Sequence, residues 1–183
     1  MLKVFFLFIR FFKKLSSNPS ATGALLQDSA AVVSGYLLGK SKIMLILFGI
    51  YYLGFTLGSV PYALFLALFA ALFSIIPYIG NIIGGGVAVI LSYIYAGSTP
   101  ALIVVGVIIL AQLLENYVFT PWIIGDQINL NPFMTVFGVI LFSTLWGMVG
   151  AIISLPLIGV LKVIFEHTKG MEAYALLINK KQK

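Results

Sequence analysis

The chain has 183 residues, of which 61% are hydrophobic and only 9% are charged. Soluble domains carry roughly 25% charged residues, so this composition excludes a soluble fold. Unpaired backbone groups are too costly in lipid, which leaves membrane helices or a closed barrel. Barrel strands alternate apolar and polar residues, whereas segments 43–47 and 102–110 are apolar at nearly every position. The sequence therefore predicts an all-α, polytopic membrane helix bundle with kinked or re-entrant helices.

The net charge is +6, and the basic residues gather at the two ends of the chain and around Lys40 and Lys42. This placement fits cytoplasmic loops under the positive-inside rule and lacks the basic stripe of a nucleic-acid surface. We therefore expect a multi-pass protein in the lipid bilayer, with a cytoplasmic C-terminus and no nucleic-acid partner. Without cysteine, disulfides and thiolate metal sites are excluded. We expect no cofactor, no metal site and no catalytic residue.

Residues 1–42 are expected to form interfacial or juxtamembrane elements. Segment 1–15 is too short to span as a helix. It fits an interfacial helix, a signal peptide or the remnant of an earlier spanning helix, and these alternatives stay open. Segment 16–22 indicates a linker, and segment 23–42 a short helix.

Residues 43–166 are expected to form the membrane transport domain, followed by a basic cytoplasmic tail at 167–183. Pro61 and Pro100 suit the first turns of their helices, where no backbone donor is needed. Several segments are short enough to be re-entrant rather than full crossings. The spanning candidates are 43–59, 61–79, 82–97, 100–115 and 133–165.

Two places in this domain predict broken helices. Pro77 interrupts an apolar run and is followed by Gly80, Asn81 and the glycines 84–86. Such a break in a membrane either lines a wet cavity or lies buried in protein, and close packing through small residues is an equally good interpretation. Segment 133–165 would be roughly 50 Å long as one helix, so we expect a break near Trp146 and Gly147 or near Gly150. Whether it forms one helix or two stays open.

A polar island interrupts the apolar sequence. Glu115 and Asp126 are the only charged residues between positions 43 and 161. Gln112, Glu115 and Asn116 share one helix face. Pro121 and Gly125, which follow, predict that this helix ends at Glu115. A carboxylate at membrane depth is costly unless it is paired or functional. The alternative is an acidic side chain solvated at a helix end, with Asp126 capping the next element.

Six motifs, in order and spacing, resemble the autoinducer-2 exporter family of bacterial transporters. They are GYLLGK (35–40), GSVPYALFLALFA (58–70), IIPYIGNIIGG (75–85), QLLENYVFTPWIIGDQINLNP (112–132), LWGMVG (145–150) and LPLIGVLKVIFE (155–166). The chain resembles the C-terminal half of the family's usual length. The resemblance implies a bacterial cytoplasmic (inner) membrane location, export of autoinducer-2 or sodium or lithium exchange for protons, and a homo-oligomer. It also places family-characteristic positions at Pro77, Gly80, Gln112, Glu115, Asn116, Pro121 and Gly125.

Three functions follow as hypotheses. The favoured one is a secondary transporter in which Asn81, Gln112 and Asn116 bind a small polar solute against an aromatic wall such as Tyr78, Tyr93 or Tyr117. The second is a monovalent cation/proton antiporter built on Glu115, and the third is a non-transporting oligomeric membrane module. An enzyme is not expected, because the single histidine, His167, lies in the polar tail.

Overall fold

The structure, a computed structural model, describes residues 19–77, 79–125, 130–168, 170–171 and 178. Every regular element in these residues is a helix, which confirms the predicted all-α bundle. Three helical stretches in this part of the chain are long and apolar enough to cross a membrane: Gly23–Leu57, Ser98–Ile124 and Pro132–Glu166.

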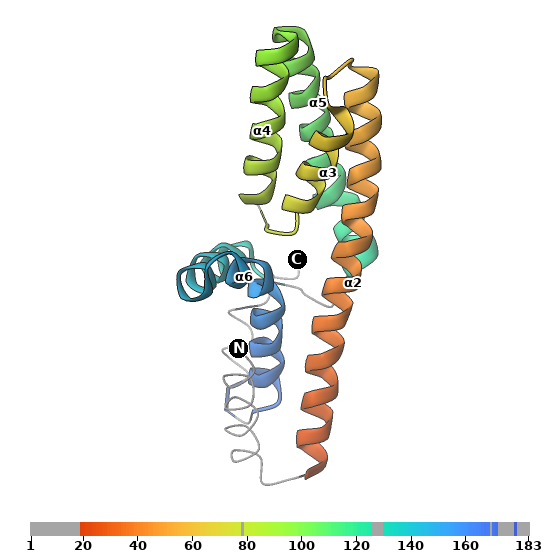
Figure 1. Cartoon of the computed structure of the whole chain (residues 1–183). Coiled ribbons are helices and arrows are strands. Elements are labelled where there is room, and N and C mark those ends of the chain that lie inside the picture. Colours follow the sequence, from red (N-terminus) through yellow and green to blue (C-terminus); the bar gives the residue numbers. More distant parts are fainter. Residues whose placement is uncertain (1–18, 78, 126–129, 169, 172–177, 179–183) are drawn as a thin grey trace.

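The first described helix, α2 (Pro19–Leu57), runs the length of the molecule (Figure 1). Its 39 residues rise roughly 60 Å. The predictions of a linker through residue 22 and of separate elements at 23–42 and 43–59 are wrong. Helix α2 stays continuous because one face packs along its whole C-terminal half, through the buried residues Tyr36, Ile43, Leu47, Tyr51 and Phe55.

Helices α3 (Ala63–Phe73) and α4 (Ile79–Ala96) form a hairpin that packs beside α2. Helix α3 has 11 residues and rises only about 16 Å, too little to cross a bilayer core about 30 Å thick. The segment predicted at 61–79 is therefore shorter than expected, and Pro61 precedes α3 instead of opening its first turn. Pro77 lies in the connection between the two helices, so the predicted break there is confirmed. The hairpin turns back halfway along α2, as a re-entrant element does (Figure 1).

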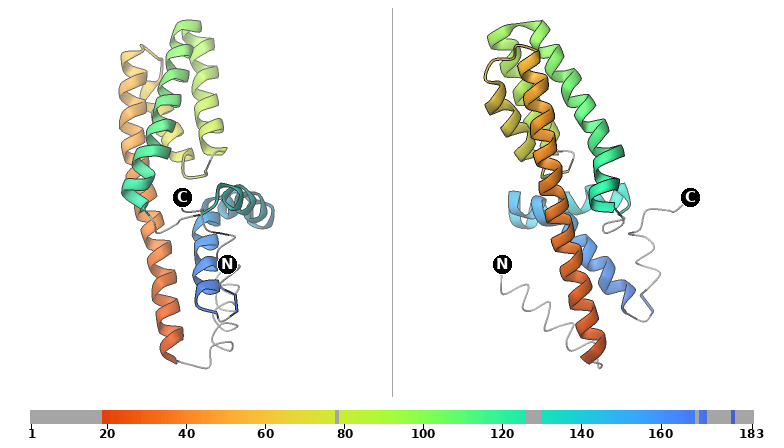
Figure 2. Two further views of the ribbon diagram at one scale, coloured as in Figure 1. Left: turned by 180° about the vertical axis from the view of Figure 1, so that it is seen from behind. Right: turned by 90° about the vertical axis from the view of Figure 1, so that its right-hand side faces the viewer.

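Helix α5 (Ser98–Leu114) returns beside α4 and continues into η1 (Glu115–Ile124), a π-helix. Pro100 lies in the first turn of α5, as predicted. Helices α3 and α5 pack against α2, and α4 packs against α3 and α5 (Figure 2).

Helix α6 (Pro132–Glu166) changes direction sharply at Gly147, whose φ of 62° and ψ of −145° are not helical. The predicted break is confirmed. The part of α6 before Gly147 lies across the molecule, and the part after it descends beside the N-terminal half of α2 (Figures 1 and 2).

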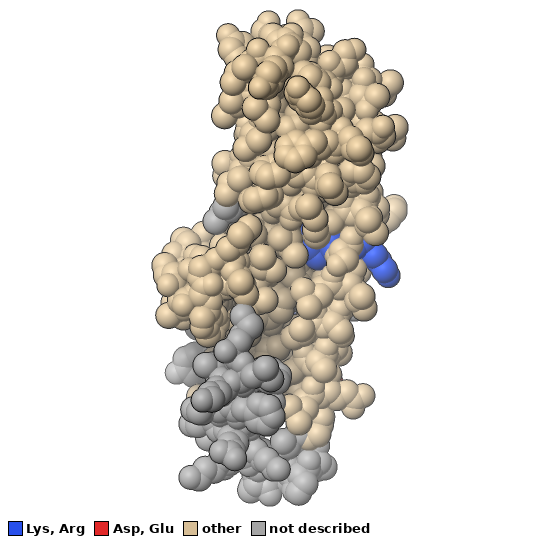
Figure 3. All heavy atoms as spheres, viewed as in Figure 1, with Lys and Arg blue, Asp and Glu red and all other residues tan. Residues whose placement is uncertain are grey.

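Large apolar side chains cover much of the described surface. Leu57 is 86% exposed and Leu45 is 72% exposed. In the described part of the face in Figure 3, charged atoms are visible only at mid-height beside α2. A soluble monomer rarely exposes such a continuous apolar surface. The exposed faces are those expected to meet lipid.

Candidate functional site

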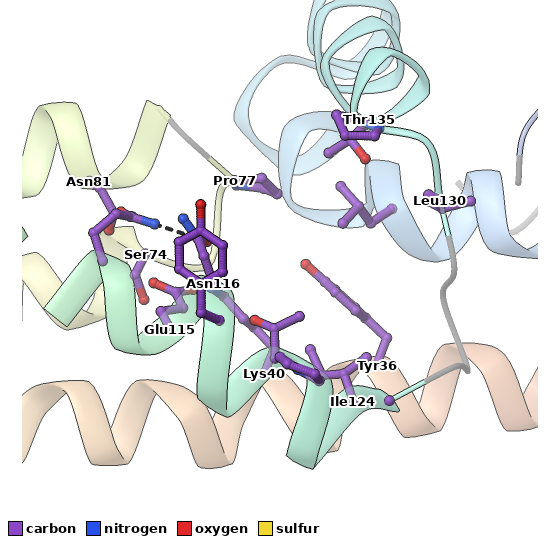
Figure 4. A pocket seen from close by; sticks show the side chains of 17 residues that line it. Tyr36, Lys40, Ser74, Pro77, Asn81, Glu115, Asn116, Ile124, Leu130 and Thr135 are labelled. Carbon is purple, nitrogen blue, oxygen red and sulfur yellow. Dashed lines mark hydrogen bonds and ion pairs between the residues drawn. The ribbon is translucent and has the colours of Figure 1, made fainter. Parts of the chain in front are cut away.

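A cavity of about 590 Å³ lies where the tip of the α3–α4 hairpin meets α2, η1 and α6 (Figure 4). Broken or irregular backbone surrounds it, since it touches the α3–α4 connection, the π-helix and the start of α6. The residues that line it are Tyr36, Lys40, Ser74, Pro77, Asn81, Gln112, Glu115, Asn116, Tyr117, Thr120, Pro121, Ile124, Gly125, Leu130, Pro132, Thr135 and Leu155.

A buried ion pair forms one wall of the cavity. The Nζ atom of Lys40 on α2 donates a hydrogen bond to Oε1 of Glu115, the first residue of η1. Each of the two residues is only 6% exposed. The alternative of a carboxylate simply solvated at a helix end is therefore excluded. Glu115 is instead a paired anion inside the fold.

Glu115 lies where the α-helix changes into a π-helix. The α-helix ends at Leu114, close to where Pro121 predicted an end, but the chain continues helically with a wider turn. A proline inside an α-helix clashes with the carbonyl four residues earlier, and bonding five residues back relieves that crowding. The helix finally ends at Gly125, whose φ of 60° and ψ of −142° suit glycine. The prediction that the helix ends at Glu115 therefore holds for the α-helix alone, because helical backbone continues to Ile124 as a π-helix.

Three amides form a chain of hydrogen bonds beside the ion pair. Asn81 Nδ2 donates to Gln112 Oε1, and Gln112 Nε2 donates to Asn116 Oδ1 at 3.1 Å. This chain joins the hairpin tip to α5 and η1. Two buried acceptors, Asn81 Oδ1 and Glu115 Oε2, have no hydrogen-bond partner among the described residues. An unsatisfied buried acceptor is costly, so both residues are suited to a ligand that brings donors.

The structure brings together most of the residues that the sequence singled out. Gln112, Glu115, Asn116 and Asn81 line the cavity, as do the breaker residues Pro77, Pro121 and Gly125.

Other candidates lie elsewhere. Gly80 packs against the Phe73 carbonyl, Gly84 packs against Ala70, and Gly147 forms the break in α6. Asp126 and Tyr78 lie outside the described residues, and Tyr93 is not part of the lining.

Sequence reasoning missed Lys40, which it assigned to a cytoplasmic loop. The available signal was spacing, because Tyr36, Lys40 and Ile43 recur on one helix face. A cation on an otherwise buried apolar face requires an anionic partner. Tyr36, Ser74 and Thr135 were also missed, since nothing in their local sequence marks a cavity wall.

The ion pair also bears on the antiporter hypothesis. That hypothesis needs a carboxylate that is free to bind a metal cation, whereas Lys40 already lies against Glu115. In the part of the chain that the structure describes, no group of three or more His, Cys, Asp or Glu residues could hold a metal ion. The neutral hydrogen-bonding groups of the cavity are therefore better placed to bind a ligand than the Glu115 carboxylate is to bind a metal cation.

Comparisons with known proteins show which family the chain resembles. A family model described as "AI-2E family transporter" matches residues 4–170. Two relatives from Bacillus subtilis strain 168 are named as transport proteins. YueF is 28% identical over 77% of this chain, and YrrI is 30% identical over 79% of it. The AI-2 transport protein TqsA of Escherichia coli K12 is 26% identical over 92% of this chain.

The matched regions cover 38%, 40% and 49% of the three relatives' own lengths, so the chain spans less than half of each. Its apolar spanning helices and its bacterial relatives make it an integral protein of the bacterial inner membrane. This chain belongs to the AI-2E transporter family.

Proposed function

We propose that the chain is the transport part of a secondary transporter that moves a small polar solute across the inner membrane, and that the cavity is its solute site. The observation that carries the proposal is the pair of unsatisfied buried acceptors, Asn81 Oδ1 and Glu115 Oε2, on residues lining a cavity among interrupted helices. Secondary transporters commonly bind their substrates where spanning helices are broken.

The chemistry of the lining suits a neutral solute with several hydroxyl groups. Asn81, Gln112 and Asn116 supply amide donors and acceptors, and Tyr117 and Tyr36 supply aromatic surface. Pockets for small solutes combine apolar walls with a few polar groups in this way. Because the relative TqsA is named for AI-2 transport, autoinducer-2 is the first solute to test.

The surroundings of the site are proposed as well. Residues 43–166, together with the part of α2 that carries Tyr36 and Lys40, would form the transport domain, and residues 167–183 would form a basic tail on the cytoplasmic side. The exposed apolar faces of α3, α4 and α5 would contact lipid and further copies of the chain in a homo-oligomer.

Flux in proteoliposomes tests the proposal. The full chain is reconstituted, and autoinducer-2 movement is compared among wild type, Asn81→Ala and Gln27→Ala. Gln27 is a matched amide control because it is exposed on α2 and does not line the cavity. We expect flux in wild type and Gln27→Ala, and a loss of about fivefold or more in Asn81→Ala, since a buried polar group left without its hydrogen-bond partner costs about 1–3 kcal/mol.

Two results would contradict the proposal. Equal flux in Asn81→Ala and wild type would remove the cavity from the pathway. Well-assembled protein without flux of any tested polar solute would favour a non-transporting oligomeric module.

A further inference from the structure

We propose that Lys40 determines the charge selectivity of the cavity: it neutralises Glu115, so the site accepts a solute without net charge and rejects monovalent cations. The inference rests on the proposed transport function and assigns a role to a residue outside the polar island. Lys40 lies on α2, 75 residues before its partner.

The first step concerns the total charge of the lining. Lys40 and Glu115 are the only Lys, Arg, Asp, Glu or His residues among the described lining residues, and tyrosine is uncharged at neutral pH. Their opposite charges cancel. An ion that enters such a site loses hydration without meeting a net countercharge. A neutral solute needs only hydrogen-bonding partners.

The second step concerns the place that Lys40 Nζ takes. It lies against one carboxylate oxygen of Glu115, where a bound metal cation would otherwise sit. The Lys40 ammonium would repel a second cation that approached the Glu115 carboxylate. Burial of both side chains limits the screening of this repulsion by solvent. Lys40 therefore acts as a built-in counterion.

The third step separates this role from packing alone. Apolar residues of similar volume replace many buried ion pairs without loss of stability. A pair kept only for structure is also expected to have both carboxylate oxygens satisfied. Here Glu115 Oε2 has no hydrogen-bond partner among the described residues, so the pair leaves an acceptor for a solute hydroxyl while its charge stays balanced.

Salt-dependent thermal unfolding of the full chain in nanodiscs tests the inference without any transported solute. Melting temperatures are measured in sodium chloride, lithium chloride and N-methylglucamine chloride at equal ionic strength. Lys40→Gln leaves Glu115 as an uncompensated anion. We expect sodium or lithium to raise its melting temperature by several degrees relative to N-methylglucamine, because a cation that binds only the folded state stabilises it. Wild type and Lys40→Arg should show no such difference.

The reciprocal variant guards against a folding defect. Glu115→Gln leaves Lys40 uncompensated, so chloride should raise its melting temperature relative to gluconate. The double variant Lys40→Gln/Glu115→Gln should respond to neither ion.

Four results would overturn the inference. The first is that sodium raises the melting temperature of wild type as much as that of Lys40→Gln. The second is that both single variants fold but that no ion changes their melting temperatures. A third is a response to ions in the double variant. The fourth is that neither single variant folds in any salt whereas the double variant folds. This result would show that the pair acts through stability alone. These results do not depend on flux, so failure here leaves the transport proposal standing, and absence of flux leaves this test valid.

Discussion

Asn81, near the start of α4, donates a hydrogen bond to Gln112 in the last turn of α5. The two residues are 31 positions apart, and their contact ties the tip of the re-entrant hairpin to the helix that leads into Glu115. Gln112 in turn donates to Asn116. These two hydrogen bonds therefore connect the hairpin tip to the beginning of the π-helix.

A double-mutant cycle on Asn81 and Gln112 should reveal this coupling. We expect Asn81→Ala and Gln112→Ala each to lower the free energy of unfolding by about 1–3 kcal/mol, because each leaves the other amide with an unsatisfied atom. The double variant should lose less than the sum of the single losses. Denaturant unfolding in mild detergent measures all four proteins. Simple additivity would mean that the two amides do not interact.

The buried and exposed ion pairs should differ greatly in their contributions. Glu115→Ala leaves Lys40 buried without its partner and should cost about 3–5 kcal/mol of stability. Glu166→Ala removes a more exposed partner, which lies 3.8 Å from Lys162, and should cost about 0–1 kcal/mol. Thermal unfolding of the two variants beside wild type makes the comparison. Similar losses in both would contradict the buried position of Glu115.

Close packing of α3 against α4 gives a prediction with an internal control. A Cβ atom at Gly80 would lie 1.7 Å from the carbonyl oxygen of Phe73, so backbone must shift. Gly86 lies on the same helix, and a Cβ atom there meets nothing within 4 Å.

We therefore expect Gly80→Ala to lower stability by about 1–3 kcal/mol or more. Gly86→Ala should be neutral or should stabilise α4 by up to about 1 kcal/mol, since alanine favours helix. The melting temperatures of both variants, compared with that of the parent protein, test these two expectations. A stable Gly80→Ala protein would mean that the hairpin is more open than described.

The sequence predicted the class of fold and much of the site for identifiable physical reasons. Lipid forbids unpaired backbone, which leaves helices or a closed barrel, and the continuous apolar runs lack the alternation of barrel strands. Pro77 and Gly147 marked real breaks because one removes a backbone donor and the other tolerates a positive φ. Gln112, Glu115 and Asn116 could be placed on one face because helical spacing is local.

What the sequence did not predict depends on contacts between distant segments. The charge rule treats Lys40 and Lys42 alike, yet only Lys40 lies on the face that carries Tyr36 and Ile43 and so turns toward Glu115. Pro121 was expected to end the helix, but the wider π-turn accommodates it. The crossing of α6 over the molecule depends on packing against α2, which no local pattern specifies.

Gly147 should be necessary for the bend in α6. Its φ of 62° and ψ of −145° lie in a region that side chains with a Cβ atom avoid, so Gly147→Ala should cost about 1–3 kcal/mol or straighten the helix. Gly106→Ala is the control, since a Cβ atom at this glycine within α5 meets nothing within 4 Å.

The bend can be measured directly because the chain has no cysteine of its own. Spin labels on cysteines introduced at Phe133 and Glu166, both exposed, report the distance between the two ends of α6. A straight helix would separate these positions by about 50 Å. We expect a clearly shorter distance in the parent protein and in Gly106→Ala, and a longer or broader distribution in Gly147→Ala. A parent distance near that of a straight helix would show that α6 crosses the membrane as one rod, and the cavity would then lose the wall that Thr135 and Leu155 provide.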